Sequence, residues 1–258
     1  MRNLSCTSVQ LDILWHAPEE NRKRLDQKLD LLTSPTDIVI LPEMFTTGFT
    51  MEAAAHAEHM DGPTMTWMAA QAEKINAVIC GSLIIEESGK YFNRFIWMYP
   101  GGMYHSYDKR HLFKMAGEHE VYTPGEERQM ITHKGWKICP MICYDLRFPV
   151  WSRNDEQYDL LIYVANWPEK RIHHWRSLIQ ARAIENQAFV IGVNRYGTDE
   201  NGHTYSGDTC VADPISEAWL YHNNQGEEIH TITLSGDHLI KTREKLPFLV
   251  DQDEYKIL

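Results

Sequence analysis

The stretch ICPMICYDLRFP, residues 138–149, places a thiol directly after an apolar run. This run continues a β-rich segment that begins at Trp136, so we predict a strand that ends at Cys143. Residues 148–151 carry a proline where a first helical turn accepts one, and we predict that a helix begins there. A cysteine at such a junction lies beside free backbone N–H groups, which can lower its pKa and hold an oxyanion. Taken alone, the stretch also fits a buried core cysteine.

The composition indicates one large domain. With 258 residues, of which 43% are hydrophobic, the chain can bury a sizeable core, and we expect a single domain over residues 1–258. The net charge of −11 repels phosphate backbones and anionic membranes, so we expect neither nucleic acid nor membrane as a partner. The five scattered cysteines, the absence of a signal-peptide pattern and the lack of an apolar run of roughly 18 residues predict a reduced, cytoplasmic protein.

The apolar pattern over the whole chain predicts a mixed α/β fold. Strands are expected over residues 4–11, 37–41, 77–86, 91–99, 103–108, 128–132, 136–142, 159–165, 189–193, 208–212 and 228–234. Helices are expected from Pro18 to Pro35, from Pro63 onward, and over residues 172–187 and 237–245, followed by an extended tail from about residue 247. Pro140 cannot donate a hydrogen bond to a strand ladder, so we predict a bulge there.

Three reactive side chains come after predicted strands. Glu43, Lys109 and Cys143 each stand just beyond the carboxyl end of a strand, where open α/β sheets build their sites. A thiol needs a base, a partly desolvated carboxylate can serve as one, and a fixed ammonium can hold a developing oxyanion. Each residue alone also fits a solvated loop, a surface strand end or core filling. Their recurrence at equivalent positions favours covalent catalysis by the cysteine.

Histidine pairs suggest a different class of protein, one that binds a metal. His56 and His59 are close in sequence, as are His173 and His174, among 13 histidines. No cysteine or carboxylate ligand set accompanies these pairs at zinc-site spacing. We therefore expect solvated histidines and no metal ion.

Five blocks of the chain resemble the nitrilase superfamily of carbon–nitrogen hydrolases. They are LPEMF at 41–45, DKRHLF at 108–113, CYDLRFP at 143–149, ANWP at 165–168 and ARAIENQ at 181–187. The resemblance covers nearly the whole chain. It implies a four-layer α-β-β-α sandwich, and a homodimer formed through helices beside the site and through the C-terminal tail.

The resemblance also implies roles for individual residues. Glu43 would be the general base and Cys143 the nucleophile, while Lys109 and the backbone N–H of Tyr144 would stabilise the oxyanion, without metal or organic cofactor. The family carries a second glutamate after the lysine block. Glu118 matches its position and would orient Lys109 and the substrate amide; Glu120, two residues on, is the alternative.

The substrate class rests on a finer resemblance. PEMFTTGF at 42–49 and NWP at 166–168 are most similar to the bacterial ω-amidase (YafV-like) branch, which implies ammonia release from small anionic ω-amides of 2-oxo acids, α-ketoglutaramate or α-ketosuccinamate. Arg147 would then hold the substrate carboxylate and Trp167 would line the pocket; alternatively, Arg147 forms an ion pair with Asp145 or another acid. The amidase that acts on deaminated glutathione shares CYDLRFP and is the second candidate. Val150 stands where that branch has glutamate, which favours an ω-amidase.

Overall fold

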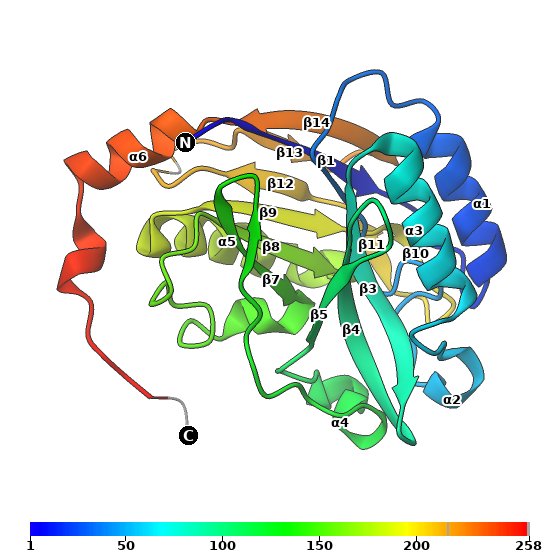
Figure 1. Cartoon of the computed structure of the whole chain (residues 1–258). Helices are drawn as coiled ribbons and strands as arrows, with labels where there is room; N and C mark the ends of the chain where they lie inside the picture. The colour runs from blue at the N-terminus through cyan, green and yellow to red at the C-terminus, as the bar shows by residue number, and fades with distance from the viewer. Residues whose placement is uncertain (216, 257–258) are drawn as a thin grey trace.

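Two six-stranded sheets form the centre of the molecule (Figure 1). The structure, a computed structural model, describes residues 1–215 and 217–256. The first sheet has the order β14-β1-β2-β3-β4-β5 and the second the order β13-β12-β9-β8-β7-β6. In the first sheet β1 and β2 run parallel, as do β2 and β3; in the second, β7, β8 and β9 run parallel. The outer strands of both sheets are antiparallel to their neighbours.

The strand and helix bounds agree closely with the predicted pattern. The first sheet contains β1 (Leu4–Gln10), β2 (Ile38–Ile40), β3 (Val78–Glu87), β4 (Lys90–Met98), β5 (Tyr104–Asp108) and β14 (Glu228–Leu234). The second contains β6 (Ile131–His133), β7 (Trp136–Ile142), β8 (Leu160–Ala165), β9 (Phe189–Asn194), β12 (Thr209–Ala212) and β13 (Tyr221–Asn223), and β10 (Tyr196–Thr198) pairs with β11 (Thr204–Ser206) in a separate ribbon. The α-helices are α1 (Pro18–Leu29), α2 (Ala53–His56), α3 (Pro63–Ile75), α4 (Glu118–Val121), α5 (Ile172–Asn186) and α6 (Gly236–Lys245).

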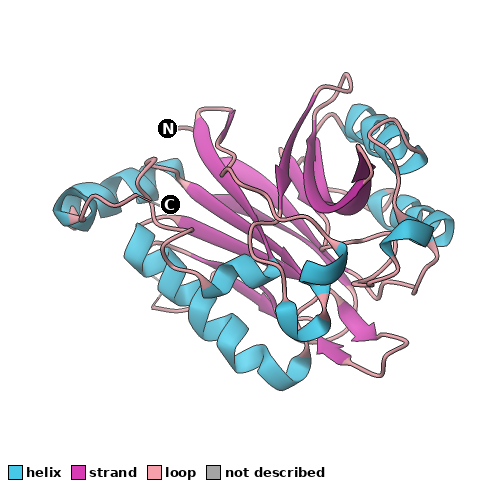
Figure 2. Ribbon diagram, turned by 90° about the horizontal axis from the view of Figure 1, so that it is seen from below, coloured by secondary structure: helices cyan, strands magenta, loops and turns pink. Residues whose placement is uncertain are grey.

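The helices cover the outer faces of the two sheets (Figure 2). Apolar side chains of α1 and α3, such as Leu25 and Met68, pack against the first sheet, and Trp175 of α5 packs against the second. Between the sheets, apolar side chains such as Phe95 and Met141 share one buried cluster. Removing these faces from water drives the layers together. The predicted four-layer α-β-β-α sandwich is confirmed.

The predicted helix at residues 148–151 is wrong. The chain instead enters a short 3₁₀ helix, η2 (Cys143–Arg147), at the cysteine itself, and residues 149–152 form a turn. The cause is Asp145, whose carboxylate oxygen Oδ2 accepts a hydrogen bond from the Ile142 N–H at 3.0 Å. That bond folds the chain back immediately after the strand, so no longer helix can begin there.

Three smaller expectations also need correction. Pro140 forms no bulge, because β7 and β8 pair in continuous register and β6 pairs with β7 only as far as Ile138. Helix α1 ends at Leu29 rather than near Pro35, and its last turn is closed by the N–H groups of residues 31 and 32, which donate to carbonyls three residues earlier. The tail includes a 3₁₀ turn, η4 (Phe248–Asp251), and its last residues, 257–258, lie outside the described residues. In the described part of the chain, no helix is both long and apolar enough to cross a membrane.

Candidate active site

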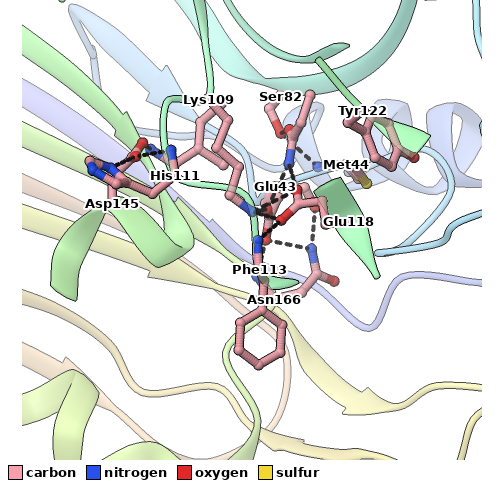
Figure 3. Close-up of polar contacts among 12 residues, drawn as sticks. Glu43, Met44, Ser82, Lys109, His111, Phe113, Glu118, Tyr122, Asp145 and Asn166 are labelled. Atoms are coloured by element: carbon pink, nitrogen blue, oxygen red, sulfur yellow. Dashed lines mark hydrogen bonds and ion pairs between the residues drawn. The ribbon is translucent and has the colours of Figure 1, made fainter. Parts of the chain in front are cut away.

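The side chains of Glu43, Lys109 and Glu118 point toward one another where the two sheets meet (Figure 3). Lys109 Nζ lies 2.9 Å from Glu43 Oε1 and 2.9 Å from Glu118 Oε1. Glu43 and Glu118 have no exposed side-chain surface and Lys109 has 1%. Cys143, at the end of β7, borders the same pocket. The structure therefore brings together all three strand-end residues predicted from the sequence.

Glu118 and not Glu120 belongs to this cluster. Gly117 turns the chain in a left-handed conformation, φ 75°, and directs Glu118 of α4 inward, while Glu120 is exposed. The backbone N–H of Phe113 donates a further hydrogen bond to Glu118 Oε2. Of the two glutamates, the buried and hydrogen-bonded Glu118 is therefore the one beside Lys109.

The Glu43 carboxylate is held by two asparagines. Asn93 Nδ2 donates to Glu43 Oε1 at 2.8 Å, and the backbone N–H of Asn166 donates to Oε2 at 2.8 Å. Asn166 Nδ2 also donates to the Glu43 backbone carbonyl at 2.6 Å. These bonds fix both oxygens of a carboxylate that could otherwise rotate. Asn166 lies in the ANWP block, whereas no sequence signal distinguishes Asn93.

A chain of hydrogen bonds extends from Asn93 to the turn after Glu43. Ser82 Oγ donates to Asn93 Oδ1 at 2.8 Å and accepts from the Met44 N–H at 2.9 Å. Met44 has φ 44°, a conformation that non-glycine residues rarely adopt and that must be held by its surroundings. Asn93 therefore holds the Glu43 carboxylate directly, and Ser82 holds both Asn93 and the turn that follows Glu43.

Charge is unevenly balanced in the cluster. Burial acts to lower the pKa of Lys109, but the carboxylates of Glu118 and Glu43 outweigh it and raise that pKa above its ordinary value. Burial raises the pKa of Glu118; Lys109 opposes this shift and Glu43 adds to it. One ammonium thus faces two carboxylates.

Cys143 sits on a sharp turn at the end of β7, in the pocket that the Glu43 carboxylate also lines. Its φ of 43° is a left-handed conformation that presents the partly exposed side chain at the end of β7. Burial and then the Glu43 carboxylate raise the pKa of the thiol well above its ordinary value, with Lys109 opposing. This is opposite to the lowered pKa expected from the sequence, because that expectation counted backbone N–H groups and omitted the burial of the thiol and the charge of Glu43 beside it.

Tyr144 follows the cysteine in the first turn of η2. The first N–H groups of a helix have no acceptor within the helix, so the Tyr144 N–H is free to bind an oxygen beside Cys143. Tyr144, Cys143 and Lys109 all border the same pocket.

Asp145 forms hydrogen bonds that link the segment carrying Cys143 to the segment carrying Lys109. Besides the Ile142 N–H, its carboxylate accepts hydrogen bonds from Tyr107 Oη at 2.8 Å and from the His111 N–H at 3.0 Å. The Asp145 side chain is fully buried and makes no ion pair with Arg147. The alternative interpretation of Arg147, as the partner of Asp145, is therefore wrong.

The pocket has a cavity of about 410 Å³, with Glu43, Lys109 and Cys143 on its lining. Arg147 lies over the Trp167 ring, with its guanidinium carbon 4.7 Å from the ring centroid, and its Nη2 is 3.1 Å from His174 Nδ1. A second guanidinium, that of Arg171, also lines the pocket and was not predicted. Among the described residues, no carboxylate lies within ion-pair distance of Arg147 or Arg171.

With this fold and site in view, the chain belongs to the carbon–nitrogen hydrolase family, whose model matches residues 6–243. It is accordingly a hydrolase of carbon–nitrogen bonds other than peptide bonds, and the predicted resemblance to the nitrilase superfamily is confirmed.

Individual relatives match over nearly their full length. The chain is 45% identical to omega-amidase YafV of Escherichia coli strain K12, with 100% of both chains covered, and 30% identical to 2-oxoglutaramate amidase of Bacillus subtilis, with 96% of each covered. A solved structure, the CN-hydrolase superfamily protein XC1258 from Xanthomonas campestris with an arsenic adduct in its active site, superposes with a TM-score of 0.97 at 41% identity over 100% of both chains.

Proposed function

We propose that this protein is a cysteine-dependent ω-amidase that releases ammonia from small anionic ω-amides of 2-oxo acids, α-ketoglutaramate or α-ketosuccinamate. The observation that carries the proposal is the pair of guanidiniums, without a carboxylate partner among the described residues, in the pocket that Cys143, Glu43 and Lys109 also line. In an ω-amide with a distal carboxylate, the amide group would lie beside Cys143 and the carboxylate beside the two guanidiniums. The activities named for the YafV and 2-oxoglutaramate amidase relatives support the same substrate class.

The first half of the reaction forms a thioester. Glu43, which lines the same pocket, accepts the thiol proton while the sulfur of Cys143 attacks the amide carbon, so a thiol with a raised pKa needs no thiolate before the attack. The carbonyl oxygen becomes an oxyanion held by Lys109 and the Tyr144 N–H. A single donor of this kind is worth about 100- to 1,000-fold in rate. Protonated Glu43 then gives its proton to the nitrogen as the C–N bond breaks and ammonia leaves.

The second half of the reaction consumes water. Glu43, again unprotonated, takes a proton from a water molecule whose oxygen attacks the thioester carbon. The same two donors hold the second oxyanion. The C–S bond breaks, the thiolate recovers its proton from Glu43, and the dicarboxylic acid departs.

Glu118 acts in this scheme through Lys109 and the substrate amide. Its carboxylate contacts the Lys109 ammonium with both oxygens, at 2.9 and 3.0 Å. This contact fixes the ammonium in one position and keeps it charged despite burial. A free lone pair of Glu118 can also accept from the NH₂ group of the amide, which would align its carbonyl toward Lys109.

Substrate recognition is assigned to Arg147, Arg171 and Trp167. A guanidinium is a permanently charged planar fork that binds a carboxylate through two hydrogen bonds. Stacking on Trp167 holds the plane of Arg147, and Trp167 Nε1 donates to the Arg171 backbone carbonyl at 2.9 Å, which links the two cations.

An ammonia-release screen tests this function. We expect the highest kcat/KM with α-ketoglutaramate or α-ketosuccinamate, lower values with the same monoamides without the 2-oxo group, and the lowest with neutral amides of similar length. Deaminated glutathione serves as the competing substrate. If it proved the best substrate, the proposal of an ω-amidase would be wrong although the chemistry at Cys143 would stand.

We also propose that the chain acts as a single domain in a homodimer in the cytoplasm. Apolar side chains are exposed on α5 and along the tail, namely Ile184, Phe248 and Val250. Exposed apolar side chains on these segments support association through them. All five cysteines are unpaired, which supports a reducing compartment. Light scattering that gives the mass of a monomer at micromolar concentration would contradict the dimer.

A further inference from the structure

Three side chains able to bind a metal ion meet at the mouth of the active-site pocket. They are His16, Glu52 and His56, and their ligand atoms all lie within 4.8 Å of one another. His16 lies in the loop between β1 and α1, whereas Glu52 directly precedes α2 and His56 is its last residue. The group is therefore built by tertiary structure and could not be found from sequence spacing around His56.

The local backbone places these side chains together. Glu52 and His56 are four positions apart across one helical turn, which puts them on the same face. The His16 N–H donates to the Thr47 carbonyl at 3.0 Å, and the left-handed φ of 50° at His16 turns its ring toward α2. The ring centroids of His16 and His56 are 3.8 Å apart.

The His16 ring has an unmet hydrogen-bonding need. Its Nε2 atom is buried and has no hydrogen-bond partner among the described residues. Native proteins rarely leave such an atom without a partner or a ligand.

We propose that His16, Glu52 and His56 form a binding site for a divalent transition-metal ion, with Zn²⁺ the best-suited occupant. Two imidazoles and one carboxylate suit the preference of Zn²⁺ for mixed nitrogen and oxygen ligands, and water would complete the tetrahedron. Bonds of about 2.0 to 2.1 Å place ligand atoms about 3.3 Å apart, so binding requires the neighbouring rings of His16 and His56 to tilt until one nitrogen of each faces the ion. The exposed Glu52 has the freedom to move toward the same ion.

The site lies outside the catalytic cluster but beside its pocket. Glu52 and Trp15 line the pocket, and Trp15 stacks on His16 with ring centroids 4.5 Å apart. Zinc binding would coordinate the Glu52 carboxylate, which lines the pocket. It would thereby add positive charge beside the pocket. The inference about the metal site does not depend on which amide is the substrate.

Isothermal titration calorimetry with ZnCl₂ tests the site. The Cys143→Ala protein is used so that the active-site thiol, itself a zinc ligand, does not contribute. We expect one Zn²⁺ per chain, and affinity lowered by about 10-fold or more when either His56→Gln or His16→Gln is added. The matched control is His59→Gln, because His59 is an exposed histidine nearby that contacts Glu86 instead.

The controls separate the possible outcomes. Unchanged affinity in the His59→Gln control together with loss in both ligand variants establishes the site, provided that melting curves show all variants folded. Absence of binding to the Cys143→Ala protein overturns the proposal. Equal affinity in the His16→Gln, His56→Gln and His59→Gln proteins overturns it as well, because zinc would then bind elsewhere.

Discussion

The ammonium nitrogen of Lys109 lies 2.9 Å from Glu43 Oε1, and both side chains are almost completely buried. Since Glu118 contacts the same ammonium, the cluster holds two carboxylates for one cation. Burial, and then the Glu43 carboxylate, raise the pKa of Cys143 and so favour the neutral thiol over the thiolate. We infer that the enzyme does not store a thiolate but forms it during attack, with Glu43 as the acceptor.

Glu43→Gln should separate turnover from thiol reactivity. The amide cannot accept the thiol proton, so kcat should fall by about 100- to 10,000-fold, the usual worth of a general base. Loss of the negative charge should at the same time lower the pKa of Cys143, because Glu43 is among the groups that raise it. Iodoacetamide should therefore alkylate Cys143 faster in the variant than in the wild type at pH 8.

The pH dependence of alkylation provides the control for this prediction. Because the thiol pKa is raised, the thiolate fraction of the wild type should still be increasing above pH 9, beyond the ordinary cysteine value of about 8.5. A wild-type rate that levels off below pH 8 would contradict the raised pKa. Near-normal turnover of Glu43→Gln would move the base elsewhere, with Glu118 as the first candidate.

Gly125→Ala should damage the site through the backbone of Lys109. A Cβ at residue 125 would lie 2.1 Å from the Asp108 carbonyl oxygen, and the Gly125 N–H donates to the Lys109 carbonyl at 2.9 Å. The strand end must shift, so we expect destabilisation of about 1 to 3 kcal/mol and a loss of kcat of at least about 10-fold.

Gly89→Ala is the comparison for this variant. Gly89 has a positive φ of 74° but no atom within 4 Å of a Cβ, so alanine there adds backbone strain without a clash. We expect a lowered melting temperature with unchanged kcat. Equal activity in the Gly125→Ala and Gly89→Ala proteins would show that the position of Lys109 tolerates the shift.

The sequence predicted the strands and the reactive residues at their ends because both depend on local pattern. The short, continuous apolar runs of β2 and β8 are typical of core strands, and the residues directly after such a strand lie at the sheet edge. Asn93 escaped notice because one polar residue within β4 is equally typical of a solvent-facing position. Its role depends on Ser82 and Glu43, which only the three-dimensional arrangement brings to it.

The turn at Cys143 and the place of Arg171 in the pocket were not predicted either, because they too depend on the three-dimensional arrangement. The turn at Cys143 is set by Asp145, whose partners Tyr107 and His111 come from β5 of the other sheet and the loop after it. Local propensity favoured a helix three residues after Asp145, and tertiary hydrogen bonds overrode it. Arg171 was missed because a cation at a helix start is most simply solvated.

Arg147→Ala should reduce recognition and leave stability almost unchanged. For an anionic ω-amide we expect kcat/KM to fall by the equivalent of about 1.5 to 3 kcal/mol, the worth of a hydrogen bond to a charged group, with a much smaller loss for a neutral amide. Because Arg147 makes no ion pair among the described residues, the melting temperature should stay close to that of the wild type. Arg171→Ala should show the same selectivity if both guanidiniums hold the substrate carboxylate.

Equal losses on anionic and neutral amides, together with a lower melting temperature, would assign Arg147 a structural role instead. Arg147→Lys provides a second comparison, since it keeps the charge and loses the planar fork. Partial recovery in that variant would indicate that charge contributes separately from geometry.

In the proposed mechanism, Cys143 alone carries the acyl group. Mass spectrometry of protein quenched during turnover of α-ketoglutaramate tests this most directly, because the acyl-enzyme is a thioester at a single position. We predict an acyl adduct on the peptide that contains Cys143, and a Cys143→Ala protein that folds but neither forms the adduct nor releases ammonia. An active Cys143→Ala protein, or an adduct found only on Cys139, would contradict the mechanism.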